Sequence, residues 1–287
     1  MKKGTVKIKF SNGFGNNLFQ YCFGRLLAEY HDLNYSHPAI PGLGIKEEKY
    51  PFNNNLQTIK FKANSNLEAK KYDIDHLKWF SKEYRYHNFD FHSFLFYFED
   101  YRIYKLYLKK IRLFFNKIEK RNNNDLVLHL RLENRIVQKT HYKNIIKPEV
   151  YIKVMQDHFK FDKLYIVTDS KRWDYVDKSH ILNLHKKYIN RSSSFVSVKK
   201  SIQYINNLIN VFKEFKPIIV HHDNMIDDFN FIRSFDKIMF KNSTFAWWAS
   251  FLSEASCVGV FGPWKPNKGG RNKNLGQMDI PGWFSWG

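Results

Sequence analysis

The sequence predicts an α/β protein built on parallel β-sheets, and three observations lead to this prediction. Short apolar segments typical of strands alternate with helical patterns along much of the chain, as they do in parallel sheets. The first strand pattern, residues 5–10, runs through a glycine-containing turn into an apolar helical face, which is how nucleotide-binding α/β units begin. Polar clusters follow several predicted strands, at the strand ends where parallel α/β proteins bind their ligands.

The predicted elements fall into two groups, separated by the asparagine run 122–124. In the first group a helix follows the opening strand, and the Pro-, Gly- and Asn-rich stretch 37–66 is expected to be irregular structure or an insertion. We therefore place an N-terminal domain over residues 1–123 and a C-terminal domain over residues 124–287. In the second group we expect strands at 125–131, 163–168, 217–221, 237–240 and 257–261, and helices near 148–158, 199–213, 226–234 and 244–254.

Length and composition fit this organisation and limit the classes of partner that the protein can bind. At roughly 150 residues per domain, 287 residues make one large domain or two modest ones, and 43% hydrophobic residues exclude a disordered or low-complexity chain. With 47 basic and 27 acidic residues the net charge is +20, which calls for an anionic partner: a nucleic acid, a phosphorylated metabolite or a membrane surface. Two cysteines cannot form a disulfide framework, so a reducing compartment is favoured.

The distribution of apolar residues favours a cytoplasmic protein. No segment approaches the ~18 continuous apolar residues of a membrane span, and the first ten residues lack the apolar region of a signal peptide. Basic residues between positions 102 and 121 alternate with Ile, Leu and Phe. This pattern is typical of a helix lying on an anionic membrane, and equally of a solvated basic helix packed on a core.

The turn after the first strand reads Gly13-Phe14-Gly15-Asn16. It lacks the third glycine of a dinucleotide-binding loop and the Gly-Lys-Ser/Thr of a P-loop. In a functional interpretation the glycines let the backbone approach a diphosphate, and Asn16 contacts the ligand at the helix start. In the alternative, this is an ordinary strand-to-helix turn with Asn16 as the N-cap.

Two strand ends carry side chains suited to a nucleotide ligand. Alternation places His129 and Arg131 on the same side of their strand, and an arginine fork binds phosphate oxygens in bidentate fashion. Alternatively, Arg131 pairs with a carboxylate such as Glu133, and His129 is an ordinary core residue. Asp169 follows the next strand and could contact a ribose, or could cap the following helix.

The sequence offers no evident metal site. Asp169 and Ser170 do not form the Asp-x-Asp of metal-dependent sugar transferases, and the adjacent His221 and His222 point apart. A diphosphate would then have to be neutralised by Arg, Lys and backbone N–H groups. The run 242–248 (NSTFAWW) supplies such a group if Ser243 or Thr244 caps a helix aimed at the anion; otherwise it is a plain cap on a core helix.

Three segments, read in order, resemble the α-1,2-fucosyltransferase family, a group similar to glycosyltransferase family 11. They are residues 13–25 (GFGNNLFQYCFGR), the pair His129-x-Arg131, and residues 242–252 (NSTFAWWASFL), against family motifs G-x-G-N-x-x-F-Q-Y, H-x-R-R-G-D and N-S-S-F-S-W-W. The resemblance spans residues 13 to about 265. It implies a GT-B fold, with two Rossmann-like domains whose parallel sheets face a cleft: an acceptor-side N-terminal domain and a GDP-sugar-binding C-terminal domain.

The same resemblance implies roles for individual residues. Arg131 is expected to hold the diphosphate of the donor, and Asp228 to read the guanine edge. Where the family has Arg-Gly-Asp after His-x-Arg, this chain has Leu132, Glu133 and Asn134, so the second arginine is missing and Glu133 becomes the candidate base. The expected catalytic residues are Arg131, His129 and Glu133. The expected donor-binding residues are Gly13, Gly15, Asn16, His129, Arg131, Asp169, Asp228, Asn242, Ser243, Thr244 and Phe245.

The function that follows is an inverting, metal-independent transfer of L-fucose from GDP-β-L-fucose to a glycan hydroxyl, expected to be α-1,2 to galactose. GDP-fucose is the donor substrate and no cofactor is expected. The acceptor would be a glycan or a lipid-linked oligosaccharide, with peripheral contact between the protein and the anionic inner membrane face. A second interpretation keeps the fold but uses another GDP- or NDP-sugar. A third, a basic nucleic-acid-binding protein, lacks any recognised nucleic-acid motif and leaves the strand-end clusters unexplained.

Overall fold

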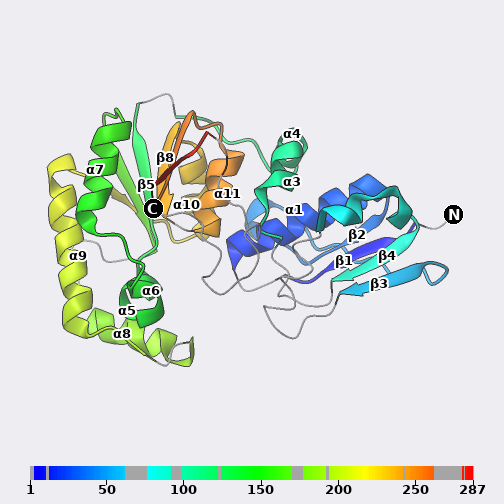
Figure 1. The fold of residues 1–287 in the computed structure, drawn as a ribbon, viewed down its shortest axis with the longest axis horizontal. Helices are drawn as coiled ribbons and strands as arrows, with labels where there is room; N and C mark the ends of the chain where they lie inside the picture. Colours follow the sequence, from blue (N-terminus) through cyan, green and yellow to red (C-terminus); the bar gives the residue numbers. More distant parts are fainter. Residues whose placement is uncertain are drawn as a thin grey trace. The chain divides into compact units, whose positions relative to one another are not determined.

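A computed structural model describes residues 3–10, 13–61, 76–91, 98–121, 124–169, 177–191, 194–241, 243–261, 280 and 282–286. The chain divides into two compact units, one of Met1–Lys117 with Pro263–Gly282 and the other of Ile118–Gly262 with Trp283–Gly287. The division lies a few residues before the boundary expected at the asparagine run. Each unit contains one parallel sheet with helices packed on it (Figure 1), which confirms the predicted α/β class with two Rossmann-like units.

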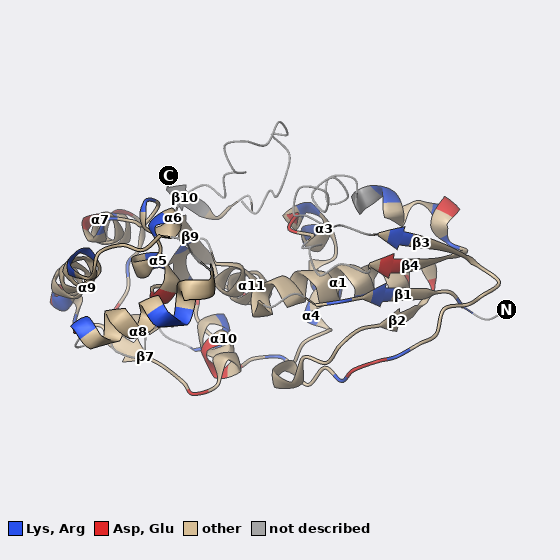
Figure 2. Cartoon of the chain, turned by 90° about the horizontal axis from the view of Figure 1, so that it is seen from below, with Lys and Arg blue, Asp and Glu red and all other residues tan. Residues whose placement is uncertain are grey.

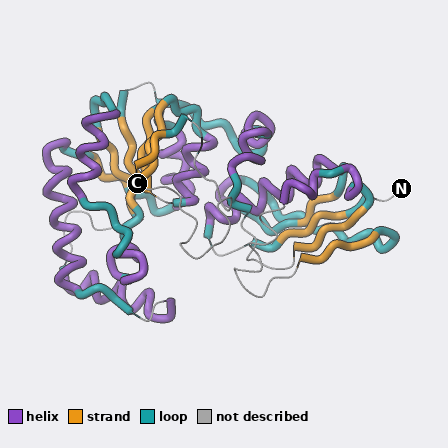
Figure 3. The backbone as a smooth tube through the Cα atoms, in the orientation of Figure 1, coloured by secondary structure: helices purple, strands orange, loops and turns teal. Residues whose placement is uncertain are grey.

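The sheet of the first unit has the strand order β2-β1-β4-β3, and every neighbouring pair is parallel. Its strands are β1 (Thr5–Ile8), β2 (Asn34–Ser36), β3 (Gln57–Phe61) and β4 (His87–Phe91). The helices of this unit are α1 (Phe14–His31), α3 (Tyr101–Leu106) and α4 (Leu108–Arg112), with short 3-10 turns at Pro41–Leu43, His76–Phe80 and Lys82–Tyr84. Figure 3 shows α1 running along the sheet.

Close packing of α1 on the sheet depends on one glycine. Val6 and Ile8 of β1 are buried, whereas Lys7 between them is exposed, as expected for a strand covered on one face. A Cβ on Gly24 of α1 would lie 2.8 Å from Ile8 Cδ1 and 2.5 Å from the ring of Tyr35. Only glycine therefore lets the helix come this near to β1 and β2.

Three expectations for the first unit need correction. The stretch 37–66 is not all irregular, since β3 pairs with β4 over five residues. The N-cap of α1 is Gly13, so Asn16 lies inside the first turn and does not cap the helix. The basic segment 102–121 is not one helix, because α3 ends before Tyr107 and α4 starts at Leu108.

The sheet of the second unit has the order β10-β9-β8-β5-β6-β7, again parallel throughout. The five predicted strands are confirmed, and β10 near the C-terminus is an addition. The strands are β5 (Leu126–Leu130), β6 (Leu164–Thr168), β7 (Ile218–Val220), β8 (Lys237–Lys241), β9 (Cys257–Phe261) and β10 (Phe284–Trp286).

Helices cover both faces of this second sheet. The predicted helices correspond to α7 (Pro148–His158), α9 (Val198–Phe212), α10 (Met225–Arg233) and α11 (Thr244–Leu252), and the sequence did not predict α5 (Glu133–Val137), α6 (Lys139–Tyr142) and α8 (Lys178–Tyr188). Figure 1 shows α7 and α9 on one face, and α10 and α11 on the other. Leu128 and Leu130 of the central strand β5 join the core under α7 and α9, so His129 between them points to the opposite face. None of the described helices combines the length and apolar character that crossing a bilayer requires.

Candidate functional site

The predicted site residues of the second unit gather at one edge of its sheet. Strands β6, β5 and β8 are neighbours and parallel, so the residues that follow them meet at the carboxyl edge. Arg131 and Glu133 follow β5, Asp169 follows β6, and Ser243 follows β8. Asn242 lies outside the described residues.

Asp169 fixes the chain that carries Arg131. Its Oδ1 accepts hydrogen bonds from the backbone N–H of Leu132 at 2.6 Å and of Glu133 at 3.2 Å. These are orphan donors at the start of α5, so the carboxylate acts on the helix after β5, whereas the next described helix, α8, is capped by Asp177. Burial raises the pKa of Asp169 to about 6, although the N–H of Leu132 opposes the shift.

Glu133 does not pair with Arg131. Its Oε2 accepts from Lys187 Nζ at 2.6 Å and from the hydroxyl of Tyr188 at 2.6 Å, and its side chain is 16% exposed. The alternative expectation of an Arg131–Glu133 ion pair is therefore wrong. Burial, together with this contact, raises the pKa of the Tyr188 hydroxyl.

His129 is a buried, neutral imidazole. Burial and the nearby Arg131 charge lower its pKa to about 3, so near neutral pH the ring is uncharged and has one N–H donor and one acceptor nitrogen. Its ring lies 5.5 Å from that of Phe245, centroid to centroid. Within the described part of the chain, Nδ1 of His129 is buried without a hydrogen-bond partner. Such an atom is costly to leave unpaired, which marks a place where a ligand or a water binds.

Two further cations, which the sequence analysis missed, lie at this edge. Arg135 Nη1 is 2.9 Å from His141 Nδ1, and Lys241 at the end of β8 donates to the carbonyl of Asn144. Burial and Arg135 lower the pKa of Lys241 to about 8, and burial with Arg135 and Arg131 lowers that of His141 to about 4. No local sequence pattern singles out Arg135, because it lies on the short helix α5 and Arg131 precedes that helix.

The start of α11 borders the same region. Ser243 is its N-cap, and the Ser243 hydroxyl accepts from the backbone N–H of Ala246 at 3.4 Å. Phe245 packs between His129 and Phe229, with its ring 5.4 Å from the latter. Thr244 is the first residue of the helix. The capping interpretation of Ser243 thus holds, and the helix start adjoins the His129 face of β5.

Asp228 lies on α10, next to Phe229 in sequence. Its Oδ1 accepts from the backbone N–H of His222 at 3.2 Å and lies 2.7 Å from Nδ1 of the same ring. The Asp228 side chain is 13% exposed. Oδ1 of Asp228 is therefore held by His222, and this contact orients Oδ2.

The remaining predicted residues belong to the first unit. Gly13 has extended dihedrals (φ −124°, ψ 128°), and no side chain caps the helix that it starts. Gly15 is buried and Asn16 is half-buried in the first turn of α1. The first bond of the helix runs from the backbone N–H of Asn17 to the Gly13 carbonyl at 2.8 Å.

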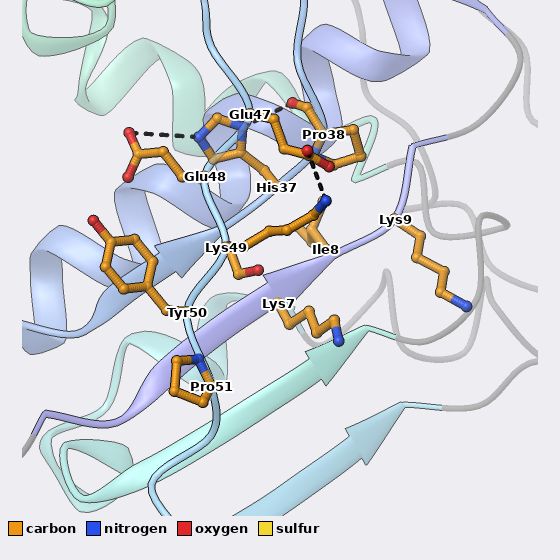
Figure 4. A pocket seen from close by; sticks show the side chains of 11 residues that line it. Lys7, Ile8, Lys9, His37, Pro38, Glu47, Glu48, Lys49, Tyr50 and Pro51 are labelled. Atoms are coloured by element: carbon orange, nitrogen blue, oxygen red, sulfur yellow. Dashed lines mark hydrogen bonds and ion pairs between the residues drawn. The ribbon is translucent and has the colours of Figure 1, made fainter.

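The first unit also contains an open pocket that the sequence did not indicate (Figure 4). It has a volume of about 420 Å³ and lies where β1 and β2 end, under the segment 47–51. Figure 4 shows His37 at its wall, with Nδ1 2.8 Å from the Pro38 carbonyl and Nε2 3.9 Å from Glu48. Glu47 and Lys49 form an ion pair at 2.8 Å beside them.

Among the described residues, no group of three or more His, Cys, Asp or Glu side chains is arranged to hold a metal ion.

Comparison with solved structures finds similarities to fucosyltransferases. One is the fucosyltransferase NodZ from Bradyrhizobium, with 10% identity and a TM-score of 0.44, covering 93% of this chain and 97% of that one. Another is POFUT1 in complex with GDP-fucose, with 10% identity and a TM-score of 0.37, covering 100% and 98%. No protein-family model and no curated protein matches the sequence. Similarity at this level does not establish a function for this chain.

Proposed function

We propose that the protein is a glycosyltransferase that transfers L-fucose from GDP-β-L-fucose to a glycan hydroxyl, with inversion and without a metal ion. The observation that carries the proposal is the carboxyl edge of the second sheet. There an exposed Arg131, the neutral His129 with an unpartnered nitrogen, and the start of α11 adjoin one another. Each of these three features belongs to a segment that resembles the α-1,2-fucosyltransferase motifs.

In the proposed reaction the acceptor oxygen attacks the anomeric carbon from the side opposite GDP. The bond between that carbon and the β-phosphate oxygen breaks, and its electron pair leaves with GDP. Negative charge develops on the diphosphate, where the Arg131 fork can donate two hydrogen bonds. The proton of the acceptor hydroxyl passes to a protein base.

Two carboxylates are candidates for that base. Glu133, the residue expected from the sequence, already accepts from Lys187 Nζ and the Tyr188 hydroxyl through its Oε2. Asp169 has a pKa near 6, close to the operating pH that suits general base catalysis. We assign Asp169 as the base and Glu133 as the residue that positions the turn carrying Arg131.

We propose the pocket of the first unit as the acceptor site. Glutamate oxygens can accept from sugar hydroxyls, Lys7 and Lys49 can donate to them or to a lipid-linked phosphate, and Tyr50 offers a flat apolar face. Galactose with a free 2-hydroxyl is the acceptor residue expected for an α-1,2 linkage. This assignment keeps the acceptor in the N-terminal half of the chain, as the GT-B arrangement requires.

The basic helices support peripheral contact of a cytoplasmic protein with an anionic membrane. Leu106 and Leu113, at the ends of α3 and α4, are 77% and 84% exposed, beside Lys105, Lys109 and Arg112. Figure 2 marks the charged residues on the ribbon. Sedimentation with phosphatidylserine vesicles should fall in a Leu106→Ser, Leu113→Ser variant, and should be unchanged by Leu182→Ser on α8. Equal binding to neutral vesicles would contradict this proposal.

The central experiment is a thermal-shift panel of GDP, UDP, CDP and dTDP, repeated in excess EDTA. A diphosphate present at 100 times its dissociation constant should stabilise the protein by about 2.7 kcal/mol. Protection by GDP in the native protein, but not in Arg131→Ala, together with fucose transfer that persists in EDTA, is the expected result. Protection by another nucleotide would favour a different NDP-sugar donor. A salt-sensitive gel shift with RNA or DNA and no nucleotide protection would favour the nucleic-acid alternative.

A further inference from the structure

The first unit has a second cavity beside the pocket of Figure 4. It has a volume of about 240 Å³ and lies between α1, β2 and the segment 47–51, and we call it the α1 cavity. His37, Glu48 and Tyr50 line both this cavity and the pocket. Two backbone hydrogen bonds join His37 and Glu48, one in each direction, at 2.9 and 3.1 Å. The α1 cavity and the pocket therefore share a wall that the backbone holds in place.

The α1 side of the cavity is a row of polar groups that hold one another in position. Arg25 Nε donates to Glu29 Oε1 at 3.0 Å, and Arg25 Nη1 donates to the Tyr21 hydroxyl at 2.6 Å. The guanidinium lies over the ring of Phe114, 4.0 Å from its centroid, and Lys110 holds the other oxygen of Glu29 at 2.6 Å. Neither bond of Arg25 uses Nη2, whose two N–H groups can donate to a ligand.

The remaining wall adds an acceptor, an amide and an aromatic surface. His37 Nδ1 lies 2.8 Å from the Pro38 carbonyl, which can only accept, so Nδ1 has the proton and Nε2 is an acceptor. Burial lowers the pKa of His37, which keeps the ring neutral near pH 7. Asn34 lines the cavity from the start of β2, and the half-exposed Tyr50 lines it from the segment 47–51. These groups can bind hydroxyls and pack against the apolar face of a ring.

The charges of the α1 cavity are mixed, unlike those at the edge of the second sheet. Arg25 is compensated by Glu29, and Glu48 is the third charged residue of the lining. A phosphate would meet two carboxylates and one paired arginine here. A neutral polyhydroxylated ring needs donors and acceptors side by side, which this lining provides. The cavity therefore fits a sugar residue without a charged group.

We propose that the α1 cavity is a second glycan subsite, which binds the sugar residue next to the galactose in the pocket. Because the two cavities share His37, Glu48 and Tyr50, consecutive residues of one glycan can occupy them together, whereas a monosaccharide occupies one only. The acceptor is then a disaccharide or a longer glycan. This inference rests on the proposed function, since the pocket is the proposed acceptor site, and it adds a requirement for acceptor length.

The test compares the KM of methyl β-galactoside with those of galactose-terminated disaccharides that differ in linkage. In the native protein at least one disaccharide should have a KM about tenfold lower, because further hydrogen bonds form. Asn34→Leu keeps the size of the side chain and removes the amide, so the KM for that disaccharide should rise about three- to tenfold. Arg25→Lys keeps the charge beside Glu29 and loses the planar fork, and should raise the same KM.

Asn54→Leu is the matched control, because Asn54 is exposed in the same unit and lines neither cavity. It should keep the native ratio of the two KM values. Equal KM values for methyl β-galactoside and every disaccharide, or a disaccharide KM unchanged in both Asn34→Leu and Arg25→Lys, would overturn the subsite and leave the proposed function standing. Calorimetry identifies the other failure. A disaccharide that binds the native protein more tightly than Asn34→Leu, yet accepts no fucose, would refute the proposed function and keep the glycan subsite. If no disaccharide binds or is fucosylated, both fail.

Discussion

The two sheets end in sites of different electrostatic character, one with mixed charge and one rich in cations. At the pocket of the first unit, Lys7 and Lys9 are exposed to solvent, and Lys49 is paired with Glu47. At the edge of the second sheet, Arg135 and Lys241 are half-buried, and burial together with a neighbouring arginine lowers the pKa of each. The first site alternates donors and acceptors, as a polyhydroxylated ligand needs. The second concentrates donors, as a diphosphate needs.

Because of this difference, we expect the loss of a charged side chain to have a larger effect at the second site than in the first pocket. Removing a cation from the second site removes a stabiliser of developing charge, in a region partly shielded from water. Removing one charge from the first pocket alters one exposed contact among several. The four predictions below test this contrast, beginning with the largest effect.

Arg131→Ala should reduce the transfer rate by a factor on the order of 10²–10³, because it removes the donor that we propose for the leaving diphosphate. Since Arg131 is exposed, the fold should be intact, which circular dichroism would check. Arg131→Lys should recover little, since an ammonium cannot replace the planar fork. Normal turnover by a folded Arg131→Ala protein would remove Arg131 from the site.

The pH dependence of the rate distinguishes the two carboxylates. Asp169 has a raised pKa of about 6, and a base must be deprotonated to act, so kcat/KM should rise with pH and level off above about 6. Asp169→Asn can still accept from the N–H groups of Leu132 and Glu133, yet should lose about 10²-fold in rate. Glu133→Gln should keep the same pH profile. A profile that loses its acidic limb in Glu133→Gln would reverse the two assignments.

Asp228→Ala should weaken GDP binding about tenfold and reduce the preference for GDP over UDP, if the free oxygen accepts from guanine. His222→Ala is the companion variant, because His222 holds the other oxygen at 2.7 Å. His222→Ala should also reduce the preference for GDP over UDP, by a smaller factor than Asp228→Ala does. Calorimetry that finds the same GDP-to-UDP ratio in Asp228→Ala would leave Asp228 a structural residue of α10.

The second site could be anticipated from the sequence because its strands are buried on both faces. Residues 126–130 are all buried and apolar apart from His129, and the parallel arrangement then places Arg131, Asp169 and Ser243 at one edge. The bond from Asp169 to the N–H of Leu132 joins residues 37 positions apart, and no local pattern encodes it. The same is true of Arg135 and His141, which lie on two short helices without clear periodicity.

The first unit was less predictable, for a related physical reason. Strand β3 carries Gln57 and Lys60 within a stretch dominated by Asn and Pro, and it is recognised as a strand only by its pairing with β4. The pocket depends on the segment 47–51 folding back over β1, where Thr5 Oγ1 donates to the Pro51 carbonyl at 2.7 Å. Composition describes such segments poorly, because tertiary hydrogen bonds decide their course.

The smallest expected effect lies in the first pocket and is the sharpest test of the contrast. Glu48 is half exposed and 3.9 Å from His37, so Glu48→Gln removes one acceptor charge while keeping the size of the side chain. The KM for a galactose-terminated acceptor should rise a few-fold, as expected for one exposed contact, with kcat and GDP affinity unchanged. A matched variant, Lys46→Gln, alters a neighbouring exposed charge that does not line the pocket, and should leave both constants as they are. If Glu48→Gln instead weakens GDP binding and spares the acceptor KM, the first unit contributes to the donor site, and the division of ligands between the two sheets is wrong.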